Sequence, residues 1–326
     1  MEDVFINSPN NLRIAVLIPC YNEELTIGKV VRDFNAALPK ADVYVFDNNS
    51  SDLSIRMARE AGANVRQVAM QGKGNVVRRM FADIGADVYV LADGDDTYPA
   101  ANAPAMVRRL LTENLDMVVG RRVTDEITAY REGHRFGNWL LTECVARLFG
   151  RTFTDILSGY RVFSRRFVKS FPALATGFEI ETELTVHALE LRMPIDEVEI
   201  PYKSRPAGST SKLSTYRDGL RILMTILKMY SHERPLMFFG SIGAALGLIA
   251  LALAVPLFIT YAETGLVPRF PTAILVTGMS LSAFLCFGCG LILDTVTRGR
   301  QEMKHLAYLQ IASPQLGSNK NIGESG

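Results

Sequence analysis

Acidic and amide side chains gather in three short clusters, each directly after an apolar run. The clusters are residues 19–23 (PCYNE), 47–52 (DNNSSD) and 93–96 (DGDD). Closely spaced carboxylates repel one another unless a cation or hydrogen bonds hold them, and their oxygen atoms suit Mg²⁺ or Mn²⁺, which share their coordination with phosphates. The Asp93-x-Asp95 spacing therefore indicates a diphosphate that is bound through a divalent metal ion.

The segment Gly72-Lys73-Gly74 precedes a helical pattern and carries a second chemical signal. At a helix N-terminus, backbone N–H groups and a lysine can bind phosphate, but a plain turn explains the segment equally well. A Walker loop is excluded, because the upstream glycine and the following Ser or Thr are missing. The segment also does not complete a dinucleotide-binding fingerprint.

Short apolar runs alternate with helical patterns over residues 12–200. The alternation predicts strands at 13–18, 43–46, 64–68, 88–92 and 117–119, and helices at 25–38, 53–61, 75–84 and 104–111. Such a pattern is typical of an α/β fold with a mostly parallel, Rossmann-like sheet that is covered on both faces. Ligands of these sheets bind at the carboxyl ends of the strands, so we expect the three acidic clusters to meet at one edge.

Two uncharged stretches in the C-terminal part, 236–262 and 271–293, predict a pair of transmembrane helices. A bilayer core of about 30 Å needs about 20 apolar residues in a helix, and both stretches exceed that length. Basic residues flank the pair, so the positive-inside rule places both flanks in the cytoplasm and the short connection outside. The net charge of +1, from 35 basic and 34 acidic residues, excludes a global basic field for nucleic acid.

These patterns divide the chain into consecutive parts. We expect a cytoplasmic catalytic domain at 1–205, amphipathic membrane-surface helices at 206–235, the two transmembrane helices, and a cytoplasmic C-terminal tail at 294–326. Apolar and basic residues interleave in the 206–235 segment, which favours contact with lipid headgroups, while an ordinary core-facing helix is the alternative. The predicted location is the inner (plasma) membrane, with several spans and a cytoplasmic catalytic domain.

The motifs occur in an order that is typical of a known protein family. IPCYNE, FDNNSSD, GKGNVVR, LADGDDTYP and TDILSGYRVFSR, followed by RPAGSTSKL and two apolar spans, resemble the family 2 glycosyltransferases with the GT-A fold. Within that family the chain looks like the polyprenyl-phosphate glycosyltransferases, which include bactoprenol glucosyltransferases and dolichol-phosphate mannose synthases. The resemblance runs from about Arg13 to about Leu293, and the absence of a QxxRW motif speaks against a processive polysaccharide synthase.

The resemblance implies a donor site and a metal site. The residues that match the nucleotide-binding positions are Pro19, Tyr21, Asn22, Glu23, Asp47, Lys73 and Asp93. Asp93 and Asp95 match the metal-binding pair, with Asp95 as the direct ligand of Mg²⁺ or Mn²⁺ and as a catalytic residue. Thr97 stands where many mannose synthases carry glutamine, so the resemblance supplies no third side-chain ligand.

A further group of residues is implied on the acceptor side. Asp155, Ser158, Gly159 and Arg161 match the DxxSGxR segment that lies near the acceptor in the family, and Ser158 and Arg161 are taken as contacts of the acceptor phosphate. Catalytic Asp155 is either a base or a positioning group, and positioning is favoured because a phosphate acceptor is already anionic. Candidate cations for that phosphate are Arg122, Arg135, Arg205 and Lys212, with Arg122 also taken as catalytic.

Two further features stay open at this level. The Gly-, Pro- and Ser-rich segment 204–212 is either a lid that orders over the substrate or a solvated linker. Glu179, Glu181 and Glu183 are crowded, and either Glu181 contacts the sugar or the three side chains form a solvated face.

The resemblance implies inverting transfer of a hexose from a nucleotide diphosphate sugar to a membrane lipid phosphate. UDP-glucose is favoured as the donor and undecaprenyl phosphate as the acceptor. GDP-mannose with a dolichol-type acceptor, transfer to a ceramide or diacylglycerol hydroxyl, and a non-catalytic partner of a flippase or polymerase are the alternatives. The expected partners are a nucleotide sugar, polyprenyl phosphate and the lipid bilayer, but no nucleic acid. A homo-oligomer is compatible with the sequence, and the oligomeric state stays open.

Overall fold

The computed structural model describes residues 12–123, 143, 145–146, 154–177, 179–203, 224 and 227–313. The chain divides into two compact units, one with residues 1–219 and 304–326 and the other with residues 220–303. The segment 204–212, with Arg205 and Lys212, lies outside the described residues, and so does Arg135.

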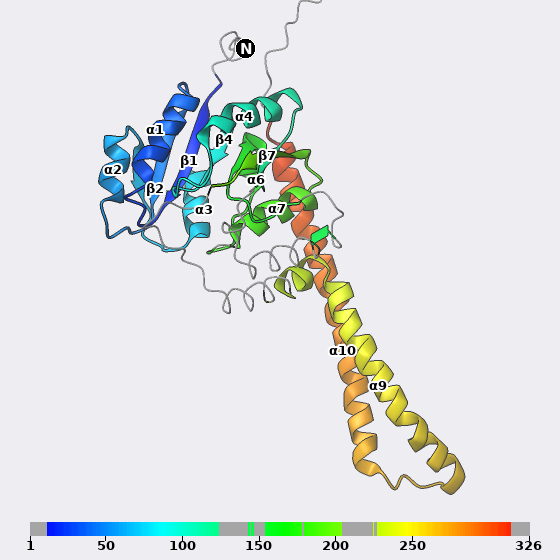
Figure 1. Ribbon diagram of the computed structural model, residues 1–326. Helices are drawn as coiled ribbons and strands as arrows, with labels where there is room; N and C mark the ends of the chain where they lie inside the picture. Colours follow the sequence, from blue (N-terminus) through cyan, green and yellow to red (C-terminus); the bar gives the residue numbers. More distant parts are fainter. Residues whose placement is uncertain are drawn as a thin grey trace, which may run out of the picture. The chain divides into compact units, whose positions relative to one another are not determined.

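A sheet of seven strands forms the core of the first unit (Figure 1). The strands are β1 (Ile14–Cys20), β2 (Asp42–Asp47), β3 (Asn64–Gln67), β4 (Val88–Leu91), β5 (Met117–Val123), β6 (Arg161–Ser164) and β7 (Ile195–Pro201). Their order is β3-β2-β1-β4-β6-β5-β7, and among these strands only β6 runs antiparallel to its neighbours. This mostly parallel sheet confirms the predicted α/β class.

Helices cover both faces of the sheet. They are α1 (Ile27–Ala37), α2 (Ser54–Glu60), α3 (Lys73–Asp83), the short 3₁₀ helix η1 (Ala100–Asn102), α4 (Ala103–Thr112), α6 (Arg165–Ser170) and α7 (Ile180–Glu190). Ile14, Val16 and Ile18 of β1 pack in a buried cluster with residues of α1 and α4. In a separate aromatic group, Phe81 of α3 contacts Phe163 of β6 edge-on. A strand buried on both faces needs apolar residues at every position, which explains the unbroken apolar run of β1.

The elements of the first unit that were not predicted from the sequence are β6, β7, η1, α6 and α7. Strand β6 has four residues, RVFS, and its buried Arg161 interrupts the apolar signal. Strand β7 lies at the edge of the sheet, and its sequence IDEVEIP carries acids where a central strand would be apolar. The predicted helices, by contrast, lie within two residues of α1, α2, α3 and α4 at each end.

The second unit contains α9 (Pro235–Thr264) and most of α10 (Phe270–Leu309), and both helices are long and apolar enough to cross a membrane. A Cβ added to Gly243 of α9 would lie 3.0 Å from the carbonyl oxygen of Ala283 in α10. A Cβ added to Gly290 of α10 would lie 3.4 Å from the Cα of Leu236 in α9. Small residues thus let the two helices approach closely.

His187 of α7 is buried between two phenylalanine rings. The ring lies 5.3 Å from each of the Phe167 and Phe171 rings, and its Nε2 is 3.1 Å from the Ser170 hydroxyl oxygen. Burial, helped by the charge of Lys304, lowers the pKa of His187 to about 3. The folded protein therefore keeps the ring neutral, whereas the unfolded chain takes up a proton below about pH 6.5.

We predict that the first unit loses stability as the pH falls from about 6.5 towards 3, by up to about 1.4 kcal/mol for each pH unit. Thermal unfolding in detergent between about pH 8 and 5 measures this loss. His187→Phe keeps an aromatic ring in the pocket and should flatten the loss above about pH 5, where most carboxylates stay ionised. His305→Gln, at an exposed position, is the control. An equal pH dependence of the wild type and His187→Phe would contradict the assignment.

Candidate active site

Hydrogen bonds join the loops after β1 and β2 at the carboxyl edge of the sheet. The Asn22 N–H donates to the Ser50 hydroxyl at 2.9 Å, and the Ser51 N–H donates to the side-chain oxygen of Asn22 at 2.8 Å. The Glu23 N–H donates to the Ser54 hydroxyl at 2.8 Å. These bonds bring the first two acidic and amide clusters together, and they engage the Asn22 side chain in holding the neighbouring loop.

Sharp turns account for part of the polar character of the three clusters. Asn22, Asn49 and Asp96 have positive φ angles of 52°, 64° and 59°. Beside them, the Tyr21 ring is exposed and Pro19 is half-buried within β1. Asn and Asp adopt the left-handed conformation more readily than other residues with a side chain. One residue of each cluster is therefore explained by the conformation of the turn. Residue spacing in the sequence does not distinguish this structural role from ligand binding.

Asp47 ends β2 and is buried, with 1% of its surface exposed. Its Oδ2 accepts the Ser50 N–H at 3.1 Å. Its Oδ1 is buried and has no hydrogen-bond partner among the described residues. Buried polar atoms without a partner are rare in native proteins, so this oxygen needs an explanation, and a ligand at the site is one. Asp47 thus offers an acceptor for an N–H or O–H group at the edge where the loops meet.

Close backbone packing explains the glycines on either side of Lys73. Gly72 has a φ of 122°, which favours glycine, and α3 begins at the next residue. A Cβ at Gly72 or Gly74 would lie closer than 3.0 Å to backbone atoms of the loop 173–177. The two glycines let this loop cover the start of α3, so phosphate binding is not needed to explain the composition of the segment.

Lys73 lies between two carboxylates that come from distant parts of the chain. Its Nζ is 2.5 Å from Oδ1 of Asp93, after β4, and 2.6 Å from Oε1 of Glu181, in the first turn of α7. Burial by itself would lower the pKa of Lys73, but the two carboxylates outweigh burial and raise that pKa, so the amine stays protonated. Oε2 of Glu181 is buried and has no hydrogen bond within the described ranges. Glu181 is therefore not part of a solvated face.

The three acids of the third cluster have different partners. Asp95 is 4% exposed, and its Oδ1 accepts the Thr97 hydroxyl at 2.6 Å. Asp96 pairs with Lys29, whose Nζ lies 2.7 Å from its Oδ1. Asp93 pairs with Lys73. Thr97, the position at which the resemblance supplies no metal ligand, is thus a hydrogen-bond partner of Asp95.

Asp93 and Asp95 carry carboxylate oxygen atoms of the kind that a divalent cation binds. In the part of the chain that the structure describes, no group of three or more His, Cys, Asp or Glu side chains is arranged to hold a metal ion. Mg²⁺ is commonly bound by one or two carboxylates and completes its coordination with phosphate oxygens and water. The donor set therefore suits an ion that binds together with a diphosphate.

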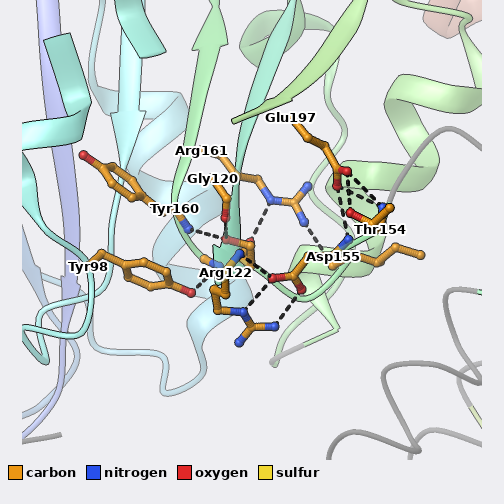
Figure 2. A network of polar contacts seen from close by, with 11 residues as sticks. Tyr98, Gly120, Arg122, Thr154, Asp155, Tyr160, Arg161 and Glu197 are labelled. Carbon is orange, nitrogen blue, oxygen red and sulfur yellow. Dashed lines mark hydrogen bonds and ion pairs between the residues drawn. The ribbon is translucent and has the colours of Figure 1, made fainter. Parts of the chain in front are cut away.

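Asp155 and Arg122 form a bidentate ion pair (Figure 2). Nε of Arg122 is 2.7 Å from Oδ2 of Asp155, and Nη2 is 2.7 Å from Oδ1. The guanidinium also lies over the Tyr202 ring, 5.4 Å from its centre. Burial would raise the pKa of Asp155, but the hydrogen bonds and charge of Arg122 lower it. Asp155 is therefore ionised and engaged with Arg122, an arrangement that suits positioning a cation better than accepting a proton.

Ser158 and Arg161 are fully buried and bond within the protein. Nε of Arg161 donates to the Ser158 carbonyl at 2.9 Å, and Nη1 donates to the Thr185 hydroxyl at 2.9 Å. The Ser158 hydroxyl donates to the Gly120 carbonyl at 2.6 Å (Figure 2). Burial lowers the pKa of Arg161 to about 10. This placement differs from the expected contact with an acceptor phosphate, because both side chains instead fix the loop that carries Asp155.

Sequence reasoning missed Tyr98 and Glu197, which hold the same loop. The Tyr98 hydroxyl accepts the Gly159 N–H at 3.1 Å. The Glu197 carboxylate accepts the N–H groups of Thr154 at 3.0 Å and Asp155 at 3.1 Å (Figure 2). Tyr98 lies within the LADGDDTYP motif, but the resemblance assigned it no role. Glu197 lies in the edge strand β7, which was not predicted.

Known proteins resemble this chain over most of its length. A family model for glycosyl transferase family 2 matches residues 15–171. Glycosyltransferase AglJ of Haloferax volcanii is 36% identical over 250 residues, which cover 76% of this chain and 81% of AglJ. The dolichyl-phosphate hexose transferase of the same organism is 31% identical over 222 residues, which cover 68% of this chain and 95% of that protein.

A solved structure shares the fold. Glucosyl-3-phosphoglycerate synthase from Mycobacterium tuberculosis, in complex with Mn²⁺, UDP and glucosyl-3-phosphoglycerate, matches with a TM-score of 0.55. The two sequences are 24% identical, and the match covers 68% of this chain and 79% of that one. The sheet topology and this likeness place the protein in the GT-A-like class of α/β folds. The chain belongs to glycosyl transferase family 2, which confirms the family resemblance.

Gly159 leaves room for the Asp93 carboxylate. A Cβ at Gly159 would lie closer than 3.0 Å to Oδ2 of Asp93. We predict that Gly159→Ala displaces this carboxylate and lowers the initial rate of sugar transfer at least about tenfold. Gly85→Ala, where an added Cβ has nothing within 4 Å, should leave the rate unchanged. Equal rates for the two variants would contradict the contact.

Proposed function

We propose that the protein is a membrane-bound, inverting glycosyltransferase that transfers a hexose from a nucleotide diphosphate sugar to a polyprenyl phosphate. UDP-glucose is the favoured donor and undecaprenyl phosphate the favoured acceptor. The observation that carries the proposal is the pairing of Lys73 with Asp93 and of Arg122 with Asp155 in one unit of a chain that has two helices of membrane-spanning length. The relative named dolichyl-phosphate hexose transferase supports the same class of reaction.

The donor binds at the edge formed by the loops after β1, β2 and β4. Oδ1 of Asp47 accepts an imino N–H of the base or a ribose hydroxyl, which would supply its missing hydrogen bond. Lys73 provides a protonated amine for the diphosphate, and Oε2 of Glu181 accepts a sugar hydroxyl. The remaining residues proposed to line the nucleotide are Pro19, Tyr21, Asn22 and Glu23.

Asp95 and Asp93 would hold the Mg²⁺ or Mn²⁺ ion. When bound, this ion neutralises the charge that grows on the diphosphate as the glycosidic bond breaks. The Thr97 hydroxyl orients Asp95, and Lys73 holds Asp93, so both carboxylates are positioned before the donor arrives. The protein's part is to keep these oxygen atoms in place.

Arg122 binds the acceptor phosphate, and Asp155 orients the guanidinium. The second pKa of a phosphate monoester is about 6, so the attacking oxygen is anionic at neutral pH and needs no strong base. Arg122 lowers the pKa of Asp155, which makes this carboxylate a poor proton acceptor. A reaction that needs no strong base is compatible with this. Direct attack opposite the leaving diphosphate inverts the anomeric configuration. The further candidates for the phosphate, outside the described residues, are Arg135, Arg205 and Lys212.

Membrane attachment suits the acceptor as well as the two apolar helices. A polyprenyl tail stays in the bilayer, so its phosphate must be reached at the membrane surface. The basic flanks of the pair place both of its ends in the cytoplasm by the positive-inside rule. The proposed location is the plasma membrane, with two spans and a cytoplasmic catalytic unit.

GDP-mannose with a dolichol-type phosphate is the second candidate pair of substrates. The name of the dolichyl-phosphate hexose transferase, which is 31% identical, favours this acceptor. Asp47 serves both donors, because uracil and guanine each carry an imino N–H that a carboxylate oxygen can accept.

Purified protein in detergent, with undecaprenyl phosphate and Mg²⁺ or Mn²⁺, tests the proposal. Radiolabelled UDP-glucose, UDP-galactose, UDP-N-acetylglucosamine and GDP-mannose are offered separately, and label is followed into extractable lipid. Transfer from UDP-glucose that stops when a chelator is added is the expected result. Nucleotide binding without transfer from any donor would overturn the acceptor assignment.

We predict that Asp95→Asn lowers transfer at least about 100-fold, because it removes a metal-bound charge with little change of volume. Asp96→Asn is the matched control, since Asp96 pairs with half-exposed Lys29 and asparagine also tolerates its positive φ. Initial rates over a range of Mn²⁺ concentrations distinguish the two variants. Full activity of Asp95→Asn would remove this residue from the metal site.

We predict that Asp155→Asn raises the KM for the lipid phosphate and lowers kcat/KM at least about tenfold, because Arg122 loses the partner that orients it. The pH dependence of kcat should keep its shape, since no proton acceptor is removed. Glu199→Gln, which breaks the surface pair with Arg121, is the control. Loss of the acid limb of the pH profile in Asp155→Asn would instead identify Asp155 as a base.

A further inference from the structure

The last turns of α10 belong to the first unit. Residues 304–326 group with residues 1–219, and α10 is helical as far as Leu309. The sequence suggested a tail from residue 294, because the apolar run ends there and charged residues return. Within the first unit, residues 304–309 instead make two contacts with buried acids.

Lys304 neutralises a buried carboxylate at the end of α7. Its Nζ is 2.6 Å from Oε2 of Glu190, whose side chain is 0% exposed, while the lysine side chain is 15% exposed. Oε1 of Glu190 is buried and has no hydrogen bond within the described part of the chain. Removing one partner of a buried ion pair leaves an uncompensated charge, so the position of Glu190 depends on Lys304.

Tyr308 makes the second contact. Its hydroxyl donates to Oδ2 of Asp116 at 2.7 Å, and the Arg166 guanidinium lies over its ring, 4.9 Å from the centre. The Asp116 side chain is 0% exposed, and its Oδ1 accepts the Ser164 hydroxyl at 2.6 Å. Asp116 directly precedes β5 and Ser164 ends β6, so Tyr308 completes a buried network at the ends of two strands.

Helix α7 connects the Lys304 contact to the candidate active site. Its last residue is Glu190, and its first turn carries Glu181, which pairs with Lys73. The two glutamates are about 13.5 Å apart along the helix axis. Residues 180–182 and 184–188 of this helix are buried, so it is packed on several sides. Glu190 and Glu181 thus stand near the two ends of one helix, so the Lys304 contact and the Lys73 contact hold the same element.

We propose that residues 304–309 form a C-terminal clamp, in which Lys304 and Tyr308 position α7 and, through it, Glu181 and Lys73 for sugar transfer. The chain that follows the second apolar span is then a working part of the catalytic unit. Lys304 is a positioning residue, because it acts through Glu190 and not on the substrate. This inference rests on the proposed transfer reaction, and the experiment below separates the two.

Lys304→Met in the full-length protein in detergent tests the clamp, because it removes the charge and keeps the apolar stem. At a temperature well below the Tm, we expect kcat for sugar transfer to fall about tenfold or more and the KM for the nucleotide sugar to rise, because Lys73 and Glu181 contact the donor. The Tm should fall by about 5 °C or more. Lys304→Arg, which keeps the cation, should recover most of the wild-type kcat.

Arg298→Met is the matched control, because it removes a positive charge from the same helix at a side chain that is 75% exposed. Its kcat should equal that of the wild type. Tyr308→Phe, which removes the hydroxyl bond to Asp116, should lower kcat in the same direction as Lys304→Met. A lower Tm with unchanged kcat in Lys304→Met would overturn the positioning role.

Amide hydrogen exchange across α7 gives a readout that does not depend on turnover. Faster exchange in Lys304→Met but not in Arg298→Met supports the clamp, and equal exchange in both variants overturns it. A wild-type protein that transfers no sugar would refute the proposed function, while the exchange comparison would still decide whether the clamp holds α7.

Discussion

Lys73 carries the positive charge on which the candidate site depends. It lies within hydrogen-bond distance of both Asp93 and Glu181, and only 11% of its side chain is exposed. Without it, two carboxylates from different elements would face each other in a medium of low dielectric constant, where like charges repel strongly. Helix α3, the loop after β4 and α7 each contribute one of these three charged residues. The elements can therefore pack together only if the lysine neutralises both acids. The close approach that Gly72 and Gly74 permit brings the lysine to its place.

The same constraint recurs at two other buried acids of the unit. Asp155 is matched by Arg122, and Glu190 is matched by Lys304. In each case the cation comes from a segment distant in the chain, so neutralising the acid also joins two elements. Two of these cations, Lys73 and Arg122, belong to the candidate site and can share their hydrogen bonds with an incoming phosphate. The ion pairs that stabilise the first unit thus include the residues that are proposed to take part in sugar transfer.

The fold was predictable where the signal is local. Strands β1 and β4 are buried on both faces and appear as apolar runs, and α1 and α4 each bury one side, which produces helical periodicity. Helix α7 escaped prediction because it is buried on several sides and includes buried polar residues such as Thr185 and His187, so no apolar stripe stands out. Strand β7 lacks an apolar run for a different reason, because it lies at the edge of the sheet and is only partly buried.

By itself the sequence determined that acidic clusters follow the strands, that two apolar segments have membrane-spanning length, and which family the motifs resemble. All of these follow from composition and from spacing along the chain. The tertiary structure alone decided which cation meets which carboxylate, since Lys73 and Glu181, like Lys304 and Glu190, are far apart in sequence and meet only when the sheet and its helices pack. It also decided that Arg161 is buried, because motif spacing does not report how much of a side chain the fold covers.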